Sequence, residues 1–410
     1  MTGPQRIVTA LVMGGALVLS ACTTFPAVGG TAASPGVGAA DGRSGTAAYP
    51  SATPSTGTVS PTASPTTDPA ASVSSGTVSP ATTPAGRISI AFAGDVHFER
   101  QLRALLDGGD GLAEVRPLLG AADITVVNLE TTLTTRGTPE PKSFTFRASP
   151  TALTTLASAG VDIVGMANNH AVDFGPVGLT DTLAAKDASP IPVIGVGRTA
   201  AEAFAPAVLT VRGVSVAVIA TTQIPEHTAA AFPATETRAG VAASVDNVRL
   251  LAAVRAARAK YDVVVVLLHW GIERTVCPST AQQTTARALE QAGADVIVGG
   301  HQHRVMGAGW LGRAYVGYGL GNFVWWLKTP TPADAASGVL TVQIDAAAVA
   351  ARAATPRDRW GQFPSVVVAD DYAPLTISLK DGIPRAAAQS AQRIAAWEAA
   401  RGCTSLKGSP

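Results

Sequence analysis

From residue 87 onward, short apolar segments alternate along the chain with segments of mixed polarity. Six of the apolar segments are rich in β-branched residues and are bounded by polar residues or glycine: RISIAFAGD, ADITVVNLE, VDIVGMANNH, YDVVVVLLHWG, ADVIVGGHQH and AYVGYGLGNF. Runs of this kind predict buried strands. Helix-like segments lie between several of them, at 98–107, 150–159, 176–187, 243–259 and 281–292. Strands that alternate with helices predict an α/β fold with much parallel pairing.

One stretch, APAVLTVRGVSVAVIATT, departs from this alternation. Its Arg212-Gly213 dipeptide separates two runs of alternating apolar residues, which predicts a β-hairpin. A hairpin at this point favours two sheets with helices outside them over a single doubly wound sheet. The strand-like segments GVLTVQI and PSVVVA and a final helix are expected to complete the same domain. We therefore expect one domain over residues 87–410, which is ample length for a single core.

The stretch before residue 87 has a different composition. Residues 23–86 consist almost entirely of Ala, Pro, Ser, Thr, Gly and Val. Such a segment has too little large apolar surface to offset the entropy lost on ordering. It predicts a disordered tether.

The first 22 residues predict the compartment. Arg6 precedes the apolar run IVTALVMGGALVLS, which has the length of a signal peptide and is short for a membrane span. The run ends in Leu19-Ser20-Ala21-Cys22, which resembles a lipobox, the bacterial signal at which the peptide is cut before a cysteine that is then lipidated. We expect a lipoprotein anchored through Cys22 to the outer face of the cell membrane. The alternative is an ordinary secretory signal that contains a cysteine.

The other two cysteines fit an oxidising compartment. With Cys22 lipidated, Cys277 and Cys403 remain as an even pair. Cys403 lies on the segment AQRIAAWEAARGC, which predicts a helix. We predict a Cys277–Cys403 disulfide that ties this helix to the loop after His269. The alternative is two free thiols.

The charge balance argues against one class of partner. The chain has a net charge of +1 at pH 7, only 14% charged residues and no outstanding basic stretch. We therefore expect no nucleic-acid partner.

Histidines lie directly after the predicted strands. Five of the six histidines do so, and all five have polar or glycine neighbours: His97, His170, His269, His301 and His303. The sixth, His227, lies in the polar stretch PEHTA and is interpreted as a surface residue. Sites in α/β sheets gather at the carboxyl ends of the strands. We therefore expect the five imidazoles to share one cavity.

The spacing and the residue types in these motifs indicate metal chemistry. Asp95 and His97, like His301 and His303, are two residues apart, so in extended backbone both side chains leave on the same side. Imidazole, carboxylate and amide ligands suit Zn²⁺, Mn²⁺ or Fe²⁺, and the absence of cysteine argues against a closed structural zinc site. The candidate ligands are too many for one tetrahedral ion and suit two ions that share a carboxylate: Asp95, His97, Glu130, Asn169, His269, His301 and His303. Two such ions clamp an in-line displacement.

Seven motifs together resemble the CapA family, which is named for poly-γ-glutamate capsule synthesis and belongs to the calcineurin-like metallophosphoesterase superfamily. The motifs are GDVHFER, VVNLETTL, MANNHAVDFGPVGLTDTL, GVGRTAAEA, LLHWGIE, GGHQHRVMGAG and YGLGNFVW, and the resemblance covers about residues 88–327. It implies a layered α/β/β/α sandwich with two metal ions at one edge. It also implies the ligand sets: Asp95, His97 and His303 for one ion, Asn169, His269 and His301 for the other, with Glu130 bridging them.

The same resemblance implies further roles. His170 matches the histidine of the superfamily's GNH motif and is the expected proton donor or substrate contact. Asp173 could orient His170, and Arg100 could meet an anion. Two departures are visible: NLE with Glu130 replaces the aspartate motif GD-x-x-D, and Asn168 replaces the glycine of GNH.

Two function classes follow from these observations. The first is a lipid-anchored, two-metal hydrolase of the cell envelope that cleaves a phosphoester or an amide of an anionic polymer. The second is an accessory protein that uses the same pocket to bind or help export a polymer such as poly-γ-glutamate. In either case, membrane proteins of capsule synthesis are possible partners.

Overall fold

The computed structural model describes residues 86–108, 110–326 and 331–410. The predicted signal peptide, the predicted lipidation site Cys22 and nearly all of the predicted tether lie outside the described residues. Those residues belong to one unit that spans Val78–Pro410. Among its helices in the described part of the chain, none has the length and apolar character needed to cross a bilayer.

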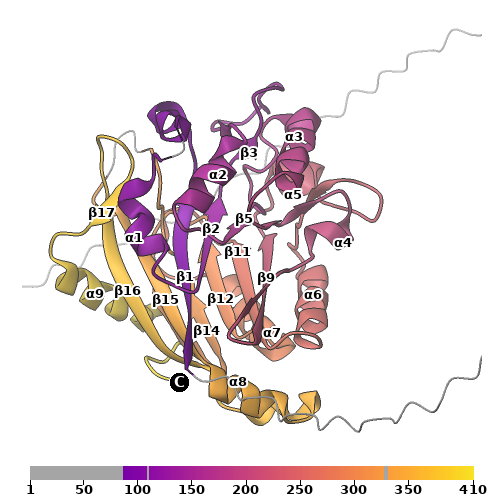
Figure 1. Cartoon of the computed structure of the whole chain (residues 1–410), viewed down its shortest axis with the longest axis vertical. Coiled ribbons are helices and arrows are strands. Elements are labelled where there is room, and N and C mark those ends of the chain that lie inside the picture. Colours follow the sequence, from indigo (N-terminus) through magenta and orange to yellow (C-terminus); the bar gives the residue numbers. More distant parts are fainter. Residues whose placement is uncertain (1–85, 109, 327–330) are drawn as a thin grey trace, which may run out of the picture. The chain divides into compact units, whose positions relative to one another are not determined.

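Two sheets form the centre of this unit (Figure 1). The first contains, in spatial order, β17 (Pro384–Ala386), β16 (Val367–Ile377), β15 (Ala336–Asp345), β1 (Arg87–Val96), β2 (Ile124–Leu129), β5 (Ile163–Gly165) and β6 (Val193–Ile194). The second contains β13 (Ala308–Leu311), β14 (Ala314–Gly317), β12 (Val296–Gly300), β11 (Val263–His269), β9 (Val214–Thr222) and β8 (Ala207–Val211). Strands β1, β2, β5 and β6 run parallel, as do β9, β11, β12 and β14.

Side-chain alternation along the buried strands divides the core into two clusters. On β1, Ile88, Ile90 and Phe92 belong to the cluster that joins the two sheets, whereas Ala91 and Ala93 belong to the cluster on the opposite face. This period of two is expected for a strand buried on both sides. Helices therefore cover the outer face of each sheet.

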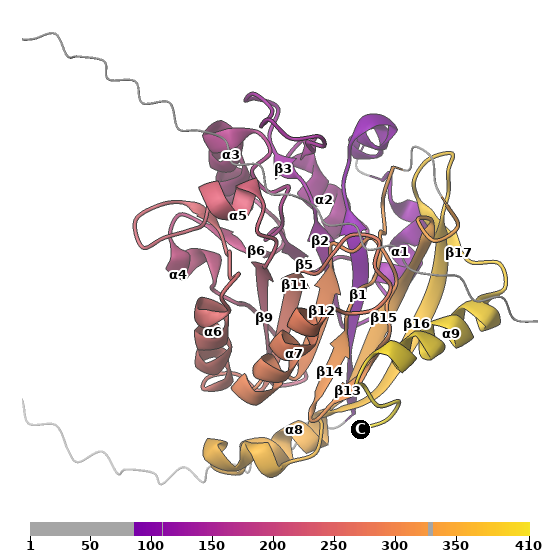
Figure 2. The same ribbon diagram turned by 180° about the vertical axis from the view of Figure 1, so that it is seen from behind.

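The first sheet is covered by α1 (Arg116–Leu119), α2 (Thr151–Ser158) and α3 (Gly175–Asp187), whose leucines join the outer cluster. The second is covered by α6 (Val248–Arg258) and α7 (Thr280–Ala292), which lie along it in Figure 2. The result is a layered α/β/β/α sandwich, as predicted.

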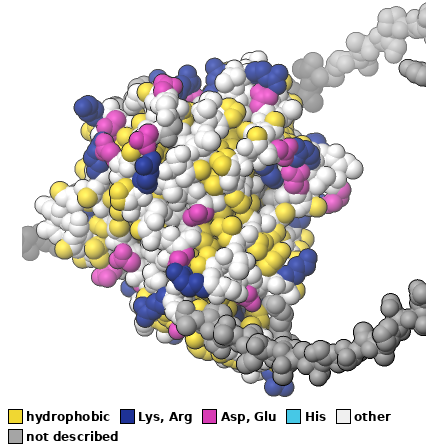
Figure 3. Space-filling model, in the orientation of Figure 1, with side chains coloured by type: hydrophobic (Ala, Val, Ile, Leu, Met, Phe, Trp, Pro, Cys, Tyr) yellow, Lys and Arg dark blue, Asp and Glu magenta, His cyan; other side chains and the backbone are white. Residues whose placement is uncertain are grey.

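The remaining elements are short or peripheral. They are β3 (Thr132–Leu133) with β4 (Arg147–Ala148), β7 (Val196–Gly197) with β10 (Gly240–Val241), α4 (Ala200–Ala203), α5 (His227–Ala231), α8 (Ala346–Ala353), α9 (Ser390–Ala399) and four 3₁₀ segments, Arg100–Leu106, Ala113–Val115, Arg357–Gln362 and Ala400–Cys403. On the face shown in Figure 3, basic and acidic side chains are interspersed.

The expected hairpin is present, and two expected helices differ from the prediction. Arg212 and Gly213 join β8 to β9 with φ values of 49° and 81°, the left-handed pair that a two-residue hairpin turn requires. The segment expected over 98–107 forms a 3₁₀ helix instead, because Arg100 has a φ of 58° where an α-helix would begin. The helix expected from residue 243 begins at Val248, because Asn247 is left-handed.

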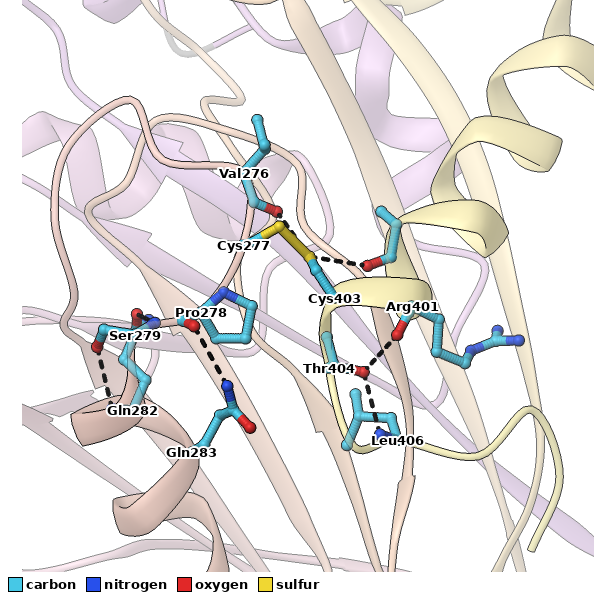
Figure 4. The surroundings of a disulfide bond; sticks show 11 residues. Val276, Cys277, Pro278, Ser279, Gln282, Gln283, Arg401, Cys403, Thr404 and Leu406 are labelled. Carbon is cyan, nitrogen blue, oxygen red and sulfur yellow. Dashed lines mark hydrogen bonds between the residues drawn. A yellow bond between two sulfur atoms is a disulfide. The ribbon is translucent and has the colours of Figure 1, made fainter.

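The C-terminal part completes the domain. Strands β15 to β17 extend the first sheet, and Trp397 of α9 stacks on Tyr372 of β16 with ring centres 4.9 Å apart. Cys277 and Cys403 form a disulfide in the structure, with their Cα atoms 5.7 Å apart (Figure 4). The bond joins the segment after α9 to the loop that follows β11.

Candidate metal centre

The motif residues of five strands meet at one edge of the sandwich. Asp95 lies at the end of β1, Glu130 follows β2, Asn169 follows β5, His269 ends β11 and His301 follows β12. All five side chains are buried. Parallel strands in neighbouring positions present their carboxyl ends at the same edge, which is how residues far apart in the chain come together here.

Glu130 is shared by two groups of possible metal ligands. In the first triad, Glu130, His269 and His301 each offer one ligand atom, and these atoms lie within 4.8 Å of one another. In the second triad, Asp95, Glu130 and His303 do the same. This is the arrangement that a bridging carboxylate requires.

The carboxylate of Glu130 accepts no hydrogen bond within the described part of the protein, although His269 Nε2 lies 3.5 Å and His170 Nε2 3.8 Å from its Oε1. Both of its oxygens are fully buried without a hydrogen bond. Burial, reinforced by the charge of Asp95, holds the pKa of Glu130 well above its usual range. A buried carboxyl without a partner is costly. The residue therefore fits a site that is completed by cations.

The first triad and Asn169 have the separations of a coordination sphere. His269 Nε2 lies 2.8 Å from Asn169 Oδ1, 3.2 Å from His301 Nδ1 and 3.5 Å from Glu130 Oε1. These spacings match the edges of a polyhedron around an ion with bonds of about 2.1 Å. Glu226, which the motifs did not identify, accepts a hydrogen bond from Asn169 Nδ2 at 3.0 Å and so directs Oδ1 toward His269. The donor set suits a borderline divalent ion.

The second triad is held by two asparagines. Asn322 Oδ1 lies 2.8 Å from His303 Nδ1, and the same ring nitrogen lies 3.5 Å from Asp95 Oδ2. Asp95 Oδ1 accepts from Asn128 Nδ2 at 2.8 Å, and its Oδ2 accepts from the His301 amide at 3.0 Å. Asn322 lies in the motif YGLGNF and was not predicted as a site residue.

His97 lies outside both triads. Its Nδ1 accepts a hydrogen bond from the Glu99 amide at 3.0 Å, and its ring stacks on Phe146 at 4.6 Å and meets the edge of Trp325 at 4.2 Å. The two-residue spacing places side chains on the same side only in extended backbone, and β1 ends at Val96, one residue before His97. His97 therefore lies next to the two triads and belongs to neither of them.

The backbone at His301 and His303 also differs from the expectation. Their φ values are +90° and +53°, so the pair lies in a left-handed turn and not in extended backbone. Such strain persists only where neighbours hold it, and here Gln302 Nε2 donates to Trp270 O at 2.8 Å. The turn sends His301 to the first triad and His303 to the second. Gly300 precedes it, and a Cβ there would lie 2.5 Å from Asp95 Oδ1.

The expected catalytic residues lie at different distances from this centre. His170 Nε2 is 3.8 Å from Glu130 Oε1, and His170 Nδ1 is 2.6 Å from Asp173 Oδ2. Arg100 is exposed, and its guanidinium lies 4.1 Å from the ring centre of Trp326. His227 is an exposed residue that pairs with Glu140 at 2.9 Å.

We expect the metal-free chain to lose stability as the pH rises from 6.5 to about 9. Burial lowers the pKa of His303, but the hydrogen bond to Asp95 and the charges of Glu130 and Asp95 outweigh it and raise the pKa from 6.5 to about 9. A raised imidazole pKa stabilises the fold fully below the unfolded value of 6.5, and this stabilisation disappears as the pH passes the folded value. Urea unfolding in the presence of a chelator measures it. The His303→Gln variant should show a flatter pH dependence, and an unchanged slope would contradict the assignment.

Comparison with known proteins places this centre in context. Residues 89–325 match the family model described as "Bacterial capsule synthesis protein PGA_cap". The chain is 28% identical over 251 residues to "PGA biosynthesis protein CapA" of Bacillus subtilis, which covers 59% of this chain and 65% of that protein. It is 28% identical over 256 residues to "Capsule biosynthesis protein CapA" of Bacillus anthracis, and the alignment covers 59% of this chain and 62% of that protein. It is 31% identical over 195 residues to "Probable polyglutamine synthesis accessory protein" of Mycobacterium tuberculosis, and the alignment covers 45% of this chain and 50% of that protein. The match thus spans less than two thirds of each relative.

Solved structures that align with the chain include a phosphatase from Mycoplasma pneumoniae and a 5′-nucleotidase from Candida albicans. The first aligns at 14% identity with a TM-score of 0.43, covering 71% of this chain and 94% of that one. The second aligns at 11% identity with a TM-score of 0.39, covering 77% of this chain and 58% of that one.

Proposed function

Because the chain belongs to the PGA_cap family of bacterial capsule synthesis proteins, we propose that it is a metal-dependent hydrolase of the cell envelope. Its substrate is a phosphoester or an amide bond of an anionic polymer. The observation that carries the proposal is the buried carboxylate of Glu130, which has no hydrogen-bond partner and is shared by two triads of possible metal ligands.

The residues of the site have two roles in this proposal, metal binding and proton transfer. Asp95, Glu130 and His303 would hold one divalent ion, and Glu130, Asn169, His269 and His301 would hold the other. The two ions, when bound, supply Lewis-acid activation of water and of the substrate oxygen. His170 exchanges a proton with the substrate through Nε2, because its Nδ1 is engaged by Asp173. Arg100, exposed beside Trp326, meets the anionic substrate outside the two triads.

The proposal places this chemistry outside the cytoplasmic membrane. The pattern Leu19-Ser20-Ala21-Cys22 supports lipidation of Cys22, and a Ser/Thr/Pro-rich stretch separates it from the domain. The relatives' names connect the family with a capsule polymer, which is an extracellular product. A lipid anchor holds the domain where such a polymer emerges.

An accessory role is the second candidate. The names of the curated relatives describe synthesis and an accessory function. In that case the same metal pocket binds the carboxylates of a polymer without cleaving it.

Turnover by the full chain tests the first candidate. We expect the purified protein to hydrolyse an aryl phosphodiester with Mn²⁺ and to bind about two equivalents of metal. The His301→Ala variant should lose at least about 100-fold in turnover, since even residues behind the ligands contribute 10- to 100-fold. His227→Ala removes an exposed histidine outside the triads and serves as the control. Tight binding of poly-γ-glutamate without turnover would favour the accessory role instead.

A further inference from the structure

Lys142 is a half-buried cation that the sequence motifs did not identify, and it contacts the turn that carries His170. It lies on the loop that joins β3 to β4 (residues 134–146), and its side chain is only 18% exposed. Its Nζ donates to Asp173 Oδ1 at 2.7 Å and to the backbone oxygen of Asn169 at 2.8 Å. Both acceptors belong to the turn after β5 (residues 168–173), which also carries His170.

Asp173 connects this cation to His170. Its carboxylate is fully buried, and while Oδ1 accepts from Lys142, Oδ2 accepts from His170 Nδ1 at 2.6 Å and from the Phe146 amide at 2.7 Å. With the Nδ1 proton engaged there, Nε2 is the nitrogen near Glu130. The tautomer and the orientation of His170 therefore depend on Asp173.

The charge of Lys142 determines whether Asp173 can do this. Burial raises the pKa of Asp173 to about 7, although the charge and hydrogen bond of Lys142, the Phe146 amide and the charge of His227 all lower it. Without the ammonium group, the pKa of Asp173 would rise further, and the carboxyl would stay protonated at a pH where the wild-type carboxyl has lost its proton. A protonated Asp173 would donate to Nδ1, and the imidazole proton would move to Nε2.

The same contact fastens the loop that packs on the histidines. Phe146 stacks on His170 with ring centres 4.1 Å apart and on His97 at 4.6 Å. Its amide is held by Asp173, and the Glu140 amide donates to Asp173 O at 2.8 Å. Lys142 thus supports His170 both through a carboxylate and through an aromatic ring.

We infer that Lys142 is a positioning residue, which fixes the tautomer and orientation of His170 through Asp173 and holds the β3–β4 loop against the site. The inference rests on the proposed function, because it assigns Lys142 to the residue that transfers protons there. Lys142 does not touch substrate in this assignment. It acts through the Asp173 carboxylate.

Nitrogen NMR of the metal-free full chain labelled with ¹⁵N-histidine tests the inference without any turnover. The His170 signals are assigned by comparison with His170→Gln. In the wild type and in Lys142→Arg at pH 8, above the Asp173 pKa of about 7, we expect the proton on Nδ1. In Lys142→Met at the same pH, we expect it on Nε2. A proton that stays on Nδ1 in Lys142→Met overturns the inference, whatever the activity of the protein.

Lys186→Met is the matched control. Lys186 is also 18% exposed, pairs with Glu202 at 3.2 Å and donates to a backbone oxygen, that of Val196, at 2.7 Å, but it lies on α3 and on none of the site loops. It reproduces the loss of a half-buried lysine ion pair. We expect the His170 signals to stay unchanged in it, and a change equal to that of Lys142→Met would reduce the role of Lys142 to general stability.

Kinetics distinguish positioning from stability once turnover is established. Lys142→Met should lower kcat by about 100-fold with little change in KM, because a catalytic group is misplaced while substrate binding persists. Metal content should stay at that of the wild type. Lys142→Arg should recover most of the kcat, and equal losses in both variants would contradict the inference.

A double variant covers the case in which Lys142→Met does not fold. Removing one partner leaves a buried charge unpaired, whereas removing both avoids this cost. We expect Lys142→Met combined with Asp173→Asn to fold and to have the kcat of Asp173→Asn alone, because Lys142 acts through that carboxylate. A further loss in the double variant would show that it acts by another route. If no variant and no wild-type sample turns over substrate, the proposed function fails while the NMR result still decides the role of Lys142.

Discussion

Glu130→Gln is expected to lower turnover strongly while leaving the metal-free chain no less stable than the wild type. Both carboxylate oxygens of Glu130 are buried without a hydrogen bond, and burial with the nearby charge of Asp95 raises its pKa well above the usual range. The carboxylate thus costs free energy in the metal-free fold. A neutral amide of the same size removes that charge, and with it the ligand common to both triads. We expect turnover to fall by on the order of 10³-fold.

Two measurements on the same samples separate these effects. Unfolding with a chelator present reports the metal-free stability. Unfolding at a metal concentration of 100 times the Kd should add about 2.7 kcal/mol per site in the wild type and much less in Glu130→Gln. Glu236→Gln, which changes an exposed acid paired with Arg249, is the control and should behave as the wild type. A Glu130→Gln chain that keeps the full stabilisation by metal would rule out the shared carboxylate.

Removing the disulfide is expected to lower the free energy of unfolding by about 2–5 kcal/mol. Cys277 and Cys403 are 126 residues apart in sequence, so their bond restricts the unfolded chain over a large part of the domain. The bond also secures the loop after β11, where the Arg274 amide donates to Gln302 O at 2.8 Å in the turn that carries His301 and His303. We therefore expect weaker metal binding as well as lower stability.

The double variant Cys277→Ser, Cys403→Ser, unfolded in urea beside the wild type, measures the first effect. Reduction of the wild-type chain should reproduce it. Equal unfolding free energies in the double variant and the wild type would contradict the expectation.

The positions of the site residues at strand ends could be predicted for two reasons. Each strand follows from the apolar pattern of its own short segment, and parallel strands always end at the same edge of a sheet. The apolar runs before Asp95, Glu130, His269 and His301 are continuous and β-branched, and the structure places each run in a sheet. Once the strands are parallel neighbours, their carboxyl ends must lie together. The hairpin at Arg212-Gly213 is equally local, since its turn type follows from two residues.

The contacts of individual side chains could not be predicted in this way. The two-residue spacing predicted extended backbone at both pairs, with both side chains on the same side, but β1 ends before His97, and His301 and His303 lie in a left-handed turn. Only neighbours that are remote in sequence hold such backbone, here Asp95 and Trp270. Lys142 carries no motif signal, because its partners come from another loop.

The sequence by itself therefore determined the α/β sandwich, the edge at which the acids and imidazoles meet and the cysteines available for pairing, because these depend on periodicity, residue type and strand direction. The tertiary structure alone decided that Glu130 is shared by two triads, that His97 stays outside them and that Lys142 reaches Asp173. These depend on distances between segments far apart in the chain, which are set by packing and hydrogen bonding and not by local pattern.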